Sequence, residues 1–240
     1  MLAVAFALTF AFLGVGSGST GISGALQNFF NFGGSSKTST KGLLDTVTKH
    51  PKDASAWRSL ATAYETNQDT ADAIGALVSY TALRPKDQSA LQELAAQYSS
   101  LASTYETQAE NAETLADTAN PGTTFAPPSG TALGKAFNNT NALGNPLATA
   151  VATNETNAAN TELEQVAELE AKAETTYQTL AKLDPNDASV QVELGEAAES
   201  ANDTATAVAA FRKFLKLAPD DPLAAQVRSA LQQLVPTKKK

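Results

Sequence analysis

Apolar residues recur along residues 54–84 at the spacing of one helix face, and a second apolar run follows after a short polar break. The first set stands at i, i+3, i+4 and i+7, the pattern of an amphipathic helix. Its members are Trp57, Leu60, Ala61 and Tyr64. The segment Asn67-Gln68-Asp69 interrupts the pattern, and Pro85 ends the second run. The sequence therefore predicts two helices joined by a tight turn.

Prolines mark a period of 34 residues along the chain. Pro51 and Pro85 are 34 positions apart, and Pro185 and Pro219 are separated by the same number. The C-terminal unit repeats the small and apolar positions of the first unit, at Leu194, Gly195, Ala207 and Phe211. Its first helix matches less well, because Gln191 and Ala198 replace the two aromatic residues.

Units with this period resemble the tetratricopeptide repeat, whose pattern is W-x2-L-G-x2-Y, then A-x3-F, then P. The matching residues of the first unit are Trp57, Leu60, Ala61, Tyr64, Ala73, Leu77 and Pro85. The resemblance implies an all-α fold, a solenoid of helical hairpins with about three repeats and capping helices. The expected domain covers residues 41–235, with repeats at 51–84, 85–184 and 185–218. A lone helix at 41–51 and a helix at 222–235 are expected to cap it.

The middle repeat is longer than the period allows. Pro85 and Pro185 are 100 residues apart, which is 66 more than one repeat. We expect its first helix to start near Gln88 and run toward residue 118, and its second helix to begin near residue 157. The extra turns are expected to pair as a long antiparallel helical hairpin, inserted around residues 105–156. The seam of that hairpin is expected to contain Leu101, Tyr105, Leu115, Leu163, Val166 and Leu169.

The tip of this insertion, residues 119–160, has an unusual composition. It contains four prolines, many Asn, Thr and Gly residues, and only one Lys and one Glu. This composition predicts irregular structure. Two interpretations remain open: a tolerated insertion at a surface turn, or a protruding contact element.

The N-terminal segment has no charged side chain over residues 1–16. We expect residues 1–22 to be a transmembrane anchor or a signal segment, followed by a Gly/Ser-rich tether over residues 23–40. A cleaved signal peptide is the alternative, with Val15 and Ser17 at the cleavage site, although no Lys or Arg precedes the apolar run. Two further interpretations are a start upstream of Met1 and a buried soluble helix. The anchor places the repeats outside the cytoplasm, and cleavage would give a secreted protein.

Composition and charge exclude several functions. The net charge is −8 and the pI about 4.7, which argues against nucleic-acid binding. The chain has no cysteine, and its single histidine, His50, precedes a proline at a turn. These residues provide no catalytic triad and no His- or Cys-based metal site. We therefore predict no enzyme, no cofactor and no metal. Residues 236–240 are expected to be a basic tail.

The resemblance also implies a binding surface. In tetratricopeptide repeats the first helix of each hairpin lines a groove, and fixed positions of that helix point into it. Carried over by register, the candidate groove residues are Arg58, Thr62, Glu65, Gln92, Ser99, Val192, Glu196 and Glu199. The groove lacks the Lys/Asn set of the family members that clamp carboxylates, so that activity is not implied.

Taken together, these features predict a non-catalytic scaffold that binds a protein or peptide partner. We expect it to be membrane-tethered, as an accessory subunit of a bacterial envelope complex. Its layout resembles single-span extracytoplasmic repeat proteins that accompany the secretion channel and its chaperones. The alternative is a secreted or surface structural subunit whose apolar N-terminus packs into an assembly. Either role allows an oligomer.

Overall fold

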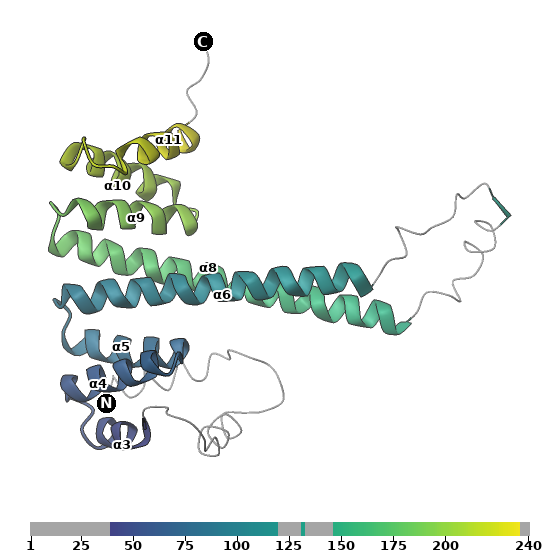
Figure 1. Cartoon of the computed structure of the whole chain (residues 1–240), viewed down its shortest axis with the longest axis horizontal. Helices are drawn as coiled ribbons and strands as arrows, with labels where there is room; N and C mark the ends of the chain where they lie inside the picture. The colour runs from purple at the N-terminus through teal and green to yellow at the C-terminus, as the bar shows by residue number, and fades with distance from the viewer. Residues whose placement is uncertain (1–38, 120–130, 133–145, 236–240) are drawn as a thin grey trace, which may run out of the picture. The chain divides into compact units, whose positions relative to one another are not determined.

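The computed structural model describes residues 39–119, 131–132 and 146–235. Helices make up nearly all of the described chain, as Figure 1 shows, and the predicted all-α class is confirmed. The helices are α3 (Lys41–Lys49), α4 (Ala54–Thr66), α5 (Thr70–Leu83), α6 (Gln88–Ala119), α8 (Pro146–Leu183), α9 (Ala188–Ser200), α10 (Thr204–Leu217) and α11 (Ala224–Leu234).

Several predicted features lie outside the described residues. They are the anchor or signal segment at 1–22, nearly all of the tether at 23–40, the basic tail at 236–240, and most of the tip between α6 and α8. Within the described ranges, every helix is too short or too polar to cross a bilayer.

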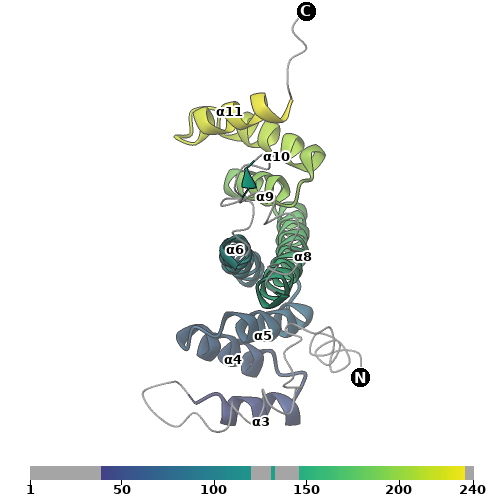
Figure 2. The same ribbon diagram turned by 90° about the vertical axis from the view of Figure 1, so that its right-hand side faces the viewer.

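The chain divides into two compact units. Unit 1 is Met1–Tyr98 with Ala173–Lys240, and unit 2 is Ser99–Lys172. Helices α6 and α8 each contribute residues to both units. In unit 1 the helices follow one another in chain order, from α3 to α11 (Figures 1 and 2).

An aspartate precedes the first helix of every repeat and caps it. Asp53 Oδ1 accepts hydrogen bonds from the backbone N–H groups of Ser55 and Ala56, at 2.9 and 3.2 Å. Asp187 caps α9 in the same way, accepting from Ser189 N and Val190 N, and Asp87 caps α6 by accepting from Ala90 N. These side chains satisfy N–H groups that the helix itself leaves unpaired. The equivalent Asp221 accepts from Leu223 N in the turn before α11 and does not cap that helix. The four equivalent aspartates are 34, 100 and 34 residues apart, so the repeat register continues across the long middle segment.

The turns inside the first and third hairpins are the same structure. Gln68 and Asn202, which are equivalent positions, have φ values of 64° and 61°. The next residue in each turn donates its N–H back to the helix, Asp69 to Tyr64 O at 2.9 Å and Asp203 to Ala198 O at 2.8 Å. This is the Schellman ending of a helix. The predicted break at residues 67–69 is confirmed.

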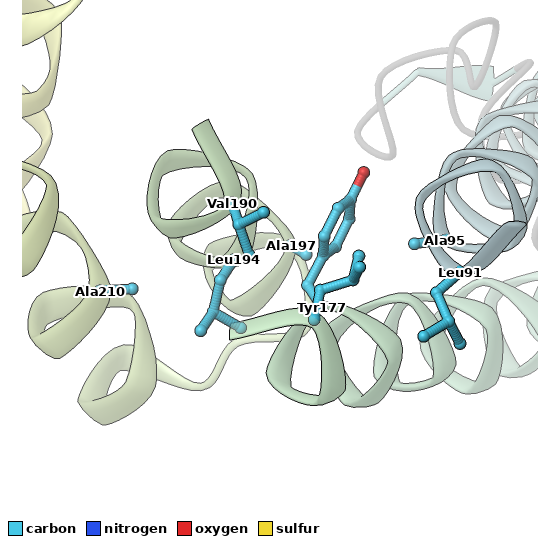
Figure 3. Close-up of a cluster of buried hydrophobic side chains, with 8 residues drawn as sticks. Leu91, Ala95, Tyr177, Val190, Leu194, Ala197 and Ala210 are labelled. Atoms are coloured by element: carbon cyan, nitrogen blue, oxygen red, sulfur yellow. The ribbon is translucent and has the colours of Figure 1, made fainter. Parts of the chain in front are cut away.

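The two ends of the split middle repeat pack together in unit 1. Figure 3 shows Leu91 and Ala95 of α6, Tyr177 of α8, and Val190 and Leu194 of α9 in one buried cluster. The small residue expected where the two helices of a hairpin cross is fully buried in all three repeats, as Ala73, Ala173 and Ala207. The middle repeat is therefore built like the others at its base.

The start of α8 differs from the prediction. The helix begins at Pro146, whereas the sequence predicted a start near residue 157. Proline is well tolerated as the first residue of a helix, because the N–H that it lacks would have no intrahelical partner there. The segment that follows is rich in alanine, the strongest helix former, and its lack of charge does not prevent a helix.

The packing in unit 2 also differs from the prediction. A buried cluster of alanines, Ala109 and Ala112 of α6 with Ala159 of α8, joins the two helices. Two of the leucines expected in the seam are instead on the surface: Leu115 is 56% exposed and Leu163 44%. Small residues in the seam let the helices approach closely, which leaves little room there for bulky side chains. Leu169 is buried as expected.

Candidate functional site

Successive first helices are joined by one recurring contact. Repeat positions are counted here from the residue that follows the turn aspartate, namely Asp53, Asp87, Asp187 or Asp221. Position 5 of one repeat meets position 6 of the next. Arg58 of α4 makes a two-pronged ion pair with Glu93 of α6, with N–O distances of 2.8 and 2.6 Å. Gln92 of α6 donates from Nε2 to the carboxylate of Glu193 in α9, at 2.9 and 3.2 Å. The contact becomes less polar along the stack.

The third contact of this kind is apolar. Val192 of α9 and Val227 of α11 are 6% and 3% exposed, and they belong to one buried cluster. The residues in these contacts are 35, 101 and 35 positions apart, so the second pair spans the same period plus the 66 inserted residues. Val192 was predicted to line the groove. In the structure it is buried in a cluster with residues of α10 and α11, so it is a core residue and unavailable to a partner.

Arg58 is held on two sides. Its guanidinium carbon lies 5.9 Å from the centre of the Tyr80 ring, in cation–π geometry. The hydrogen bonds with Glu93 are the main cause that raises the pKa of Arg58. The Tyr80 hydroxyl in turn donates to Asp87 Oδ2 at 2.5 Å. The predicted single cation of the groove is therefore already bound to groups of its own chain.

Glu65 and Glu93 form a carboxylate pair beside Arg58. Burial, followed by the contact with Glu93, raises the pKa of Glu65 to about 7. Burial also opposes the ionisation of Glu93, but the hydrogen bonds from Arg58 and the contact with Glu65 together lower its pKa. A shared proton accounts for both directions: Glu65 carries it, and Glu93 stays ionised against Arg58.

More carboxylates lie on α9. Burial and the nearby charges of Asp187 and Glu196 raise the pKa of Glu193, against the hydrogen bond from Gln92. Burial and the charge of Glu199 raise the pKa of Glu196. Both Glu196 and Glu199 are exposed. This part of the surface is acidic.

The predicted groove residues thus separate into two groups. Four of them are exposed on the first helices of unit 1, and we call this surface the first-helix face: Thr62, Gln92, Glu196 and Glu199. Arg58, Glu65 and Val192 are engaged by neighbouring residues of their own chain. Ser99 belongs to unit 2, where its hydroxyl hydrogen-bonds with the Glu170 carboxylate.

Sequence reasoning missed Glu93 and Glu193, the partners at the sixth position. A signal was present, because each lies 35 residues, or 35 plus the insertion, after a polar residue at the fifth position. Among the described residues, no group of three or more acidic or histidine side chains could hold a metal ion.

Comparison with known families agrees with this geometry. Residues 43–98 and 171–222 match a family model described as tetratricopeptide repeat. The match supports the tetratricopeptide-repeat pattern in these two segments. The fold class is accordingly an all-α solenoid of such repeats, as the sequence predicted. The match stops at residue 98 and resumes at 171, almost the limits of unit 2. No curated protein matches the chain.

The repeats indicate a scaffold for protein–protein interaction, because stacked hairpins of this kind form extended binding surfaces. Their first helices present exposed hydroxyl, amide and carboxylate groups that can form hydrogen bonds or ion pairs with a partner. The arrangement supports recognition of protein surfaces.

Proposed function

We propose that the protein is a non-catalytic, membrane-tethered scaffold that holds a partner protein against its first-helix face. It would be an accessory subunit of a bacterial envelope complex, with the repeats outside the cytoplasm. The observation that carries the proposal is the first-helix face itself. Thr62, Glu196 and Glu199 are exposed on helices whose spacing is fixed by the recurring contacts between repeats.

The tethering part of the proposal rests on the N-terminal sequence. Residues 1–16 contain no charged side chain, and a Gly/Ser-rich stretch separates them from α3. Such a segment would anchor the chain at a bilayer and leave the repeats free to meet partners within reach of the tether.

Site-specific photocrosslinking in native membranes tests the scaffold. A photoreactive amino acid at Thr62 or at Glu196 should give crosslinks to the same partner protein. The matched control is Arg212, which is exposed on α10, a second helix. If the partner is crosslinked from Arg212 as efficiently as from both first-helix positions, the first-helix face is not the binding surface.

N-terminal sequencing of the mature protein tests the tether. A chain that retains residues 1–17 and resists alkaline extraction from membranes agrees with an anchor. A mature start after residue 17 would rule it out. If the segment is retained and the protein is a soluble oligomer, the apolar N-terminus packs into an assembly, and the structural-subunit alternative is correct. The exposed Leu115 and Leu163 of unit 2 favour that alternative, because they offer apolar contact surface.

A further inference from the structure

A pocket of about 790 Å³ lies beside the turn that joins the first repeat to the second. It is formed by α4, the end of α5 and residues 84–87, all within unit 1. Three of its side chains are cations, namely Arg58, Arg84 and Lys86, and Tyr80 adds a ring and a hydroxyl group. The volume falls within the range of ordinary ligand sites.

The one carboxylate in this pocket is already engaged. Asp87 accepts hydrogen bonds from the Tyr80 hydroxyl at 2.5 Å and from Ala90 N at 3.1 Å. The bond with Tyr80 is the main cause that lowers the pKa of Asp87. Asp87 is therefore held ionised at the start of α6, and its single negative charge offsets only part of the positive charge of the three cations.

The cations are only partly compensated. Glu93 takes two N–H groups of Arg58, and a guanidinium has five. Arg84 and Lys86 are exposed, and neither makes an ion pair with any part of the chain that the structure describes. The pocket is thus positive on a protein whose net charge is −8.

The other turns between repeats show that the fold does not require these cations. The four equivalent turns read HPKD, RPKD, DPND and APDD, at residues 50–53, 84–87, 184–187 and 218–221. The backbone bond that closes the turn, from Asp87 N to Arg84 O at 3.1 Å, recurs from Asp221 to Ala218 at 3.3 Å without any cation. The charge at residues 84 and 86 is therefore available for a role outside folding.

We propose that this pocket binds an acidic segment of a protein partner, with adjacent carboxylates on Arg84 and Lys86 and a third on Arg58. Arginine offers a planar fork that matches a carboxylate, and the exposed lysine adds a mobile charge beside it. The inference rests on the proposed function only in taking the partner to be a protein. It needs neither the membrane tether nor the first-helix face.

Fluorescence anisotropy with the full chain tests the pocket. The probe is a fluorescein-labelled peptide of six alternating Glu and Asp residues, and the neutral probe is its Gln/Asn counterpart. The test variant is Arg84→Gln with Lys86→Gln. The control variant is Arg212→Gln with Lys216→Gln, which changes the charge equally at exposed positions on α10. Circular dichroism checks that both variants remain folded.

The acidic peptide should bind the wild-type chain at low salt and bind the pocket variant roughly tenfold more weakly, as expected when two exposed ion pairs are lost. The affinity of the control variant for the acidic peptide should stay within about twofold of wild type.

An equal loss of affinity in both variants would mean that the peptide responds only to net charge, and the proposal would be wrong. Absence of binding to wild type at millimolar peptide, or equal binding of the neutral peptide, would also overturn it. Displacement of the peptide by inorganic phosphate at equal anion charge would also overturn the proposal, because the pocket would then be a phosphate site.

The same variants separate this inference from the proposed function. Photocrosslinks from Thr62 and Glu196 do not depend on Arg84 or Lys86. If the peptide fails to bind while those crosslinks persist, only the pocket proposal fails. If the peptide binds as expected while the crosslinks are absent, the first-helix face is wrong and the pocket remains.

Discussion

The first and third hairpins turn after 13 residues, whereas the middle hairpin continues for several more turns of helix before it returns. Helices α4 and α9 end at equivalent residues, and Gln68 and Asn202 follow in the left-handed conformation. The equivalent residue of the middle repeat is Ala102, which is helical and 1% exposed. At these positions the closed repeats have Asn67-Gln68-Asp69 and Ala201-Asn202-Asp203, and the extended repeat has Leu101-Ala102-Ser103. Because Asp and Asn favour turns and caps and Ala favours helix, we expect these three positions to determine whether a repeat closes or extends.

The two regions also differ in how they are packed. The repeat cores contain leucines and aromatic residues, such as Leu60 and Phe211, at 1% and 2% exposure. Apart from Leu169, the buried residues described in unit 2 are alanines, and two of its leucines, Leu115 and Leu163, are on the surface. A two-helix unit with an alanine seam buries less apolar area per residue, so we expect unit 2 to contribute less to stability than unit 1.

The largest expected effect comes from placing a charge in a repeat core. Leu60→Glu should cost about 4 kcal/mol or more, because it removes buried apolar surface and buries a carboxylate without a partner. Leu115→Glu, at an exposed leucine of unit 2, should change stability by no more than about 0.5 kcal/mol. Thermal melting followed by circular dichroism measures both. Similar melting temperatures for the two variants would contradict the difference between the regions.

The second prediction concerns how the third repeat differs from the first. A Cβ atom on Gly195 would lie 2.3 Å from two ring carbons of Phe211, so Gly195→Ala should cost about 1–3 kcal/mol. The first repeat has Ala61 and Leu77 at these two positions. Adding Phe211→Leu to Gly195→Ala should therefore cost less than the sum of the two single changes.

Urea denaturation of the four proteins in this double-mutant cycle gives the coupling directly. Gly75→Ala is the matched control, since nothing lies within 4 Å of the position of its new Cβ. It should stabilise the protein by about 0.5–1 kcal/mol, because glycine is unfavourable inside a helix. Simple additivity in the cycle would show that Gly195 and Phe211 are not matched to each other.

The sequence was sufficient for the register of the repeats because that register depends on local features. Proline and aspartate at fixed spacing precede the first helices, and a three-residue break ends those of the first and third repeats. The start of α8 at Pro146 was missed because the segment that follows has little charge and few large apolar residues, so it shows no clear period.

The candidate site was less predictable because it depends on contacts between repeats. Register alone placed Arg58 and Val192 at groove positions, yet Glu93 binds Arg58, and Val192 is buried against residues of α10 and α11. Both outcomes follow from residues of later helices that the pattern of one helix does not specify. The pattern within a single repeat does not contain that information.

The third prediction concerns one position of the repeat, where glycine should stabilise the protein in the first repeat and destabilise it in the second. Gln68→Gly should stabilise the protein by roughly 0.5–1 kcal/mol, because the left-handed conformation is costly for a residue with a Cβ atom. Ala102→Gly should destabilise it by about 1–2 kcal/mol, through lost helix propensity and a lost buried methyl group. Urea denaturation measures both. Two effects of the same sign would mean that this position does not decide between turn and helix.

A smaller effect on stability should depend on pH, because Glu65 and Glu93, which belong to successive repeats, lie close together. The pKa of Glu65, at about 7, is above its usual value, so the folded state holds the proton more tightly than the unfolded state. Its contribution to stability is therefore complete below the usual glutamate pKa and is lost as the pH rises through about 7. Glu65→Gln should be nearly neutral at pH 4 and stabilising by at most about 1 kcal/mol at pH 8, since solvent screens this partly exposed pair.

Denaturation at several pH values checks this window, with Glu113→Gln on the exposed surface of unit 2 as the control. The control should show no such trend. A stabilisation by Glu65→Gln that is already complete at pH 5 would indicate that Glu65 is ionised there in the folded protein, and that the pair does not share a proton.

The smallest effect on the stability of unit 1 should come from removing the inserted residues of the middle repeat, although this is the largest change in sequence. Replacing residues 101–170 with Asn-Gln-Asp-Thr removes 66 residues net and installs the turn of the first repeat at the equivalent position of the second. Because the base of the middle repeat already packs like its neighbours, the shortened chain should unfold cooperatively at a midpoint close to that of the full chain. A chain that loses its helix content or precipitates would show that the repeats need unit 2 to fold. A chain that folds and loses its crosslinked partner would instead place the specific role of the protein in unit 2, where the match to the repeat family stops.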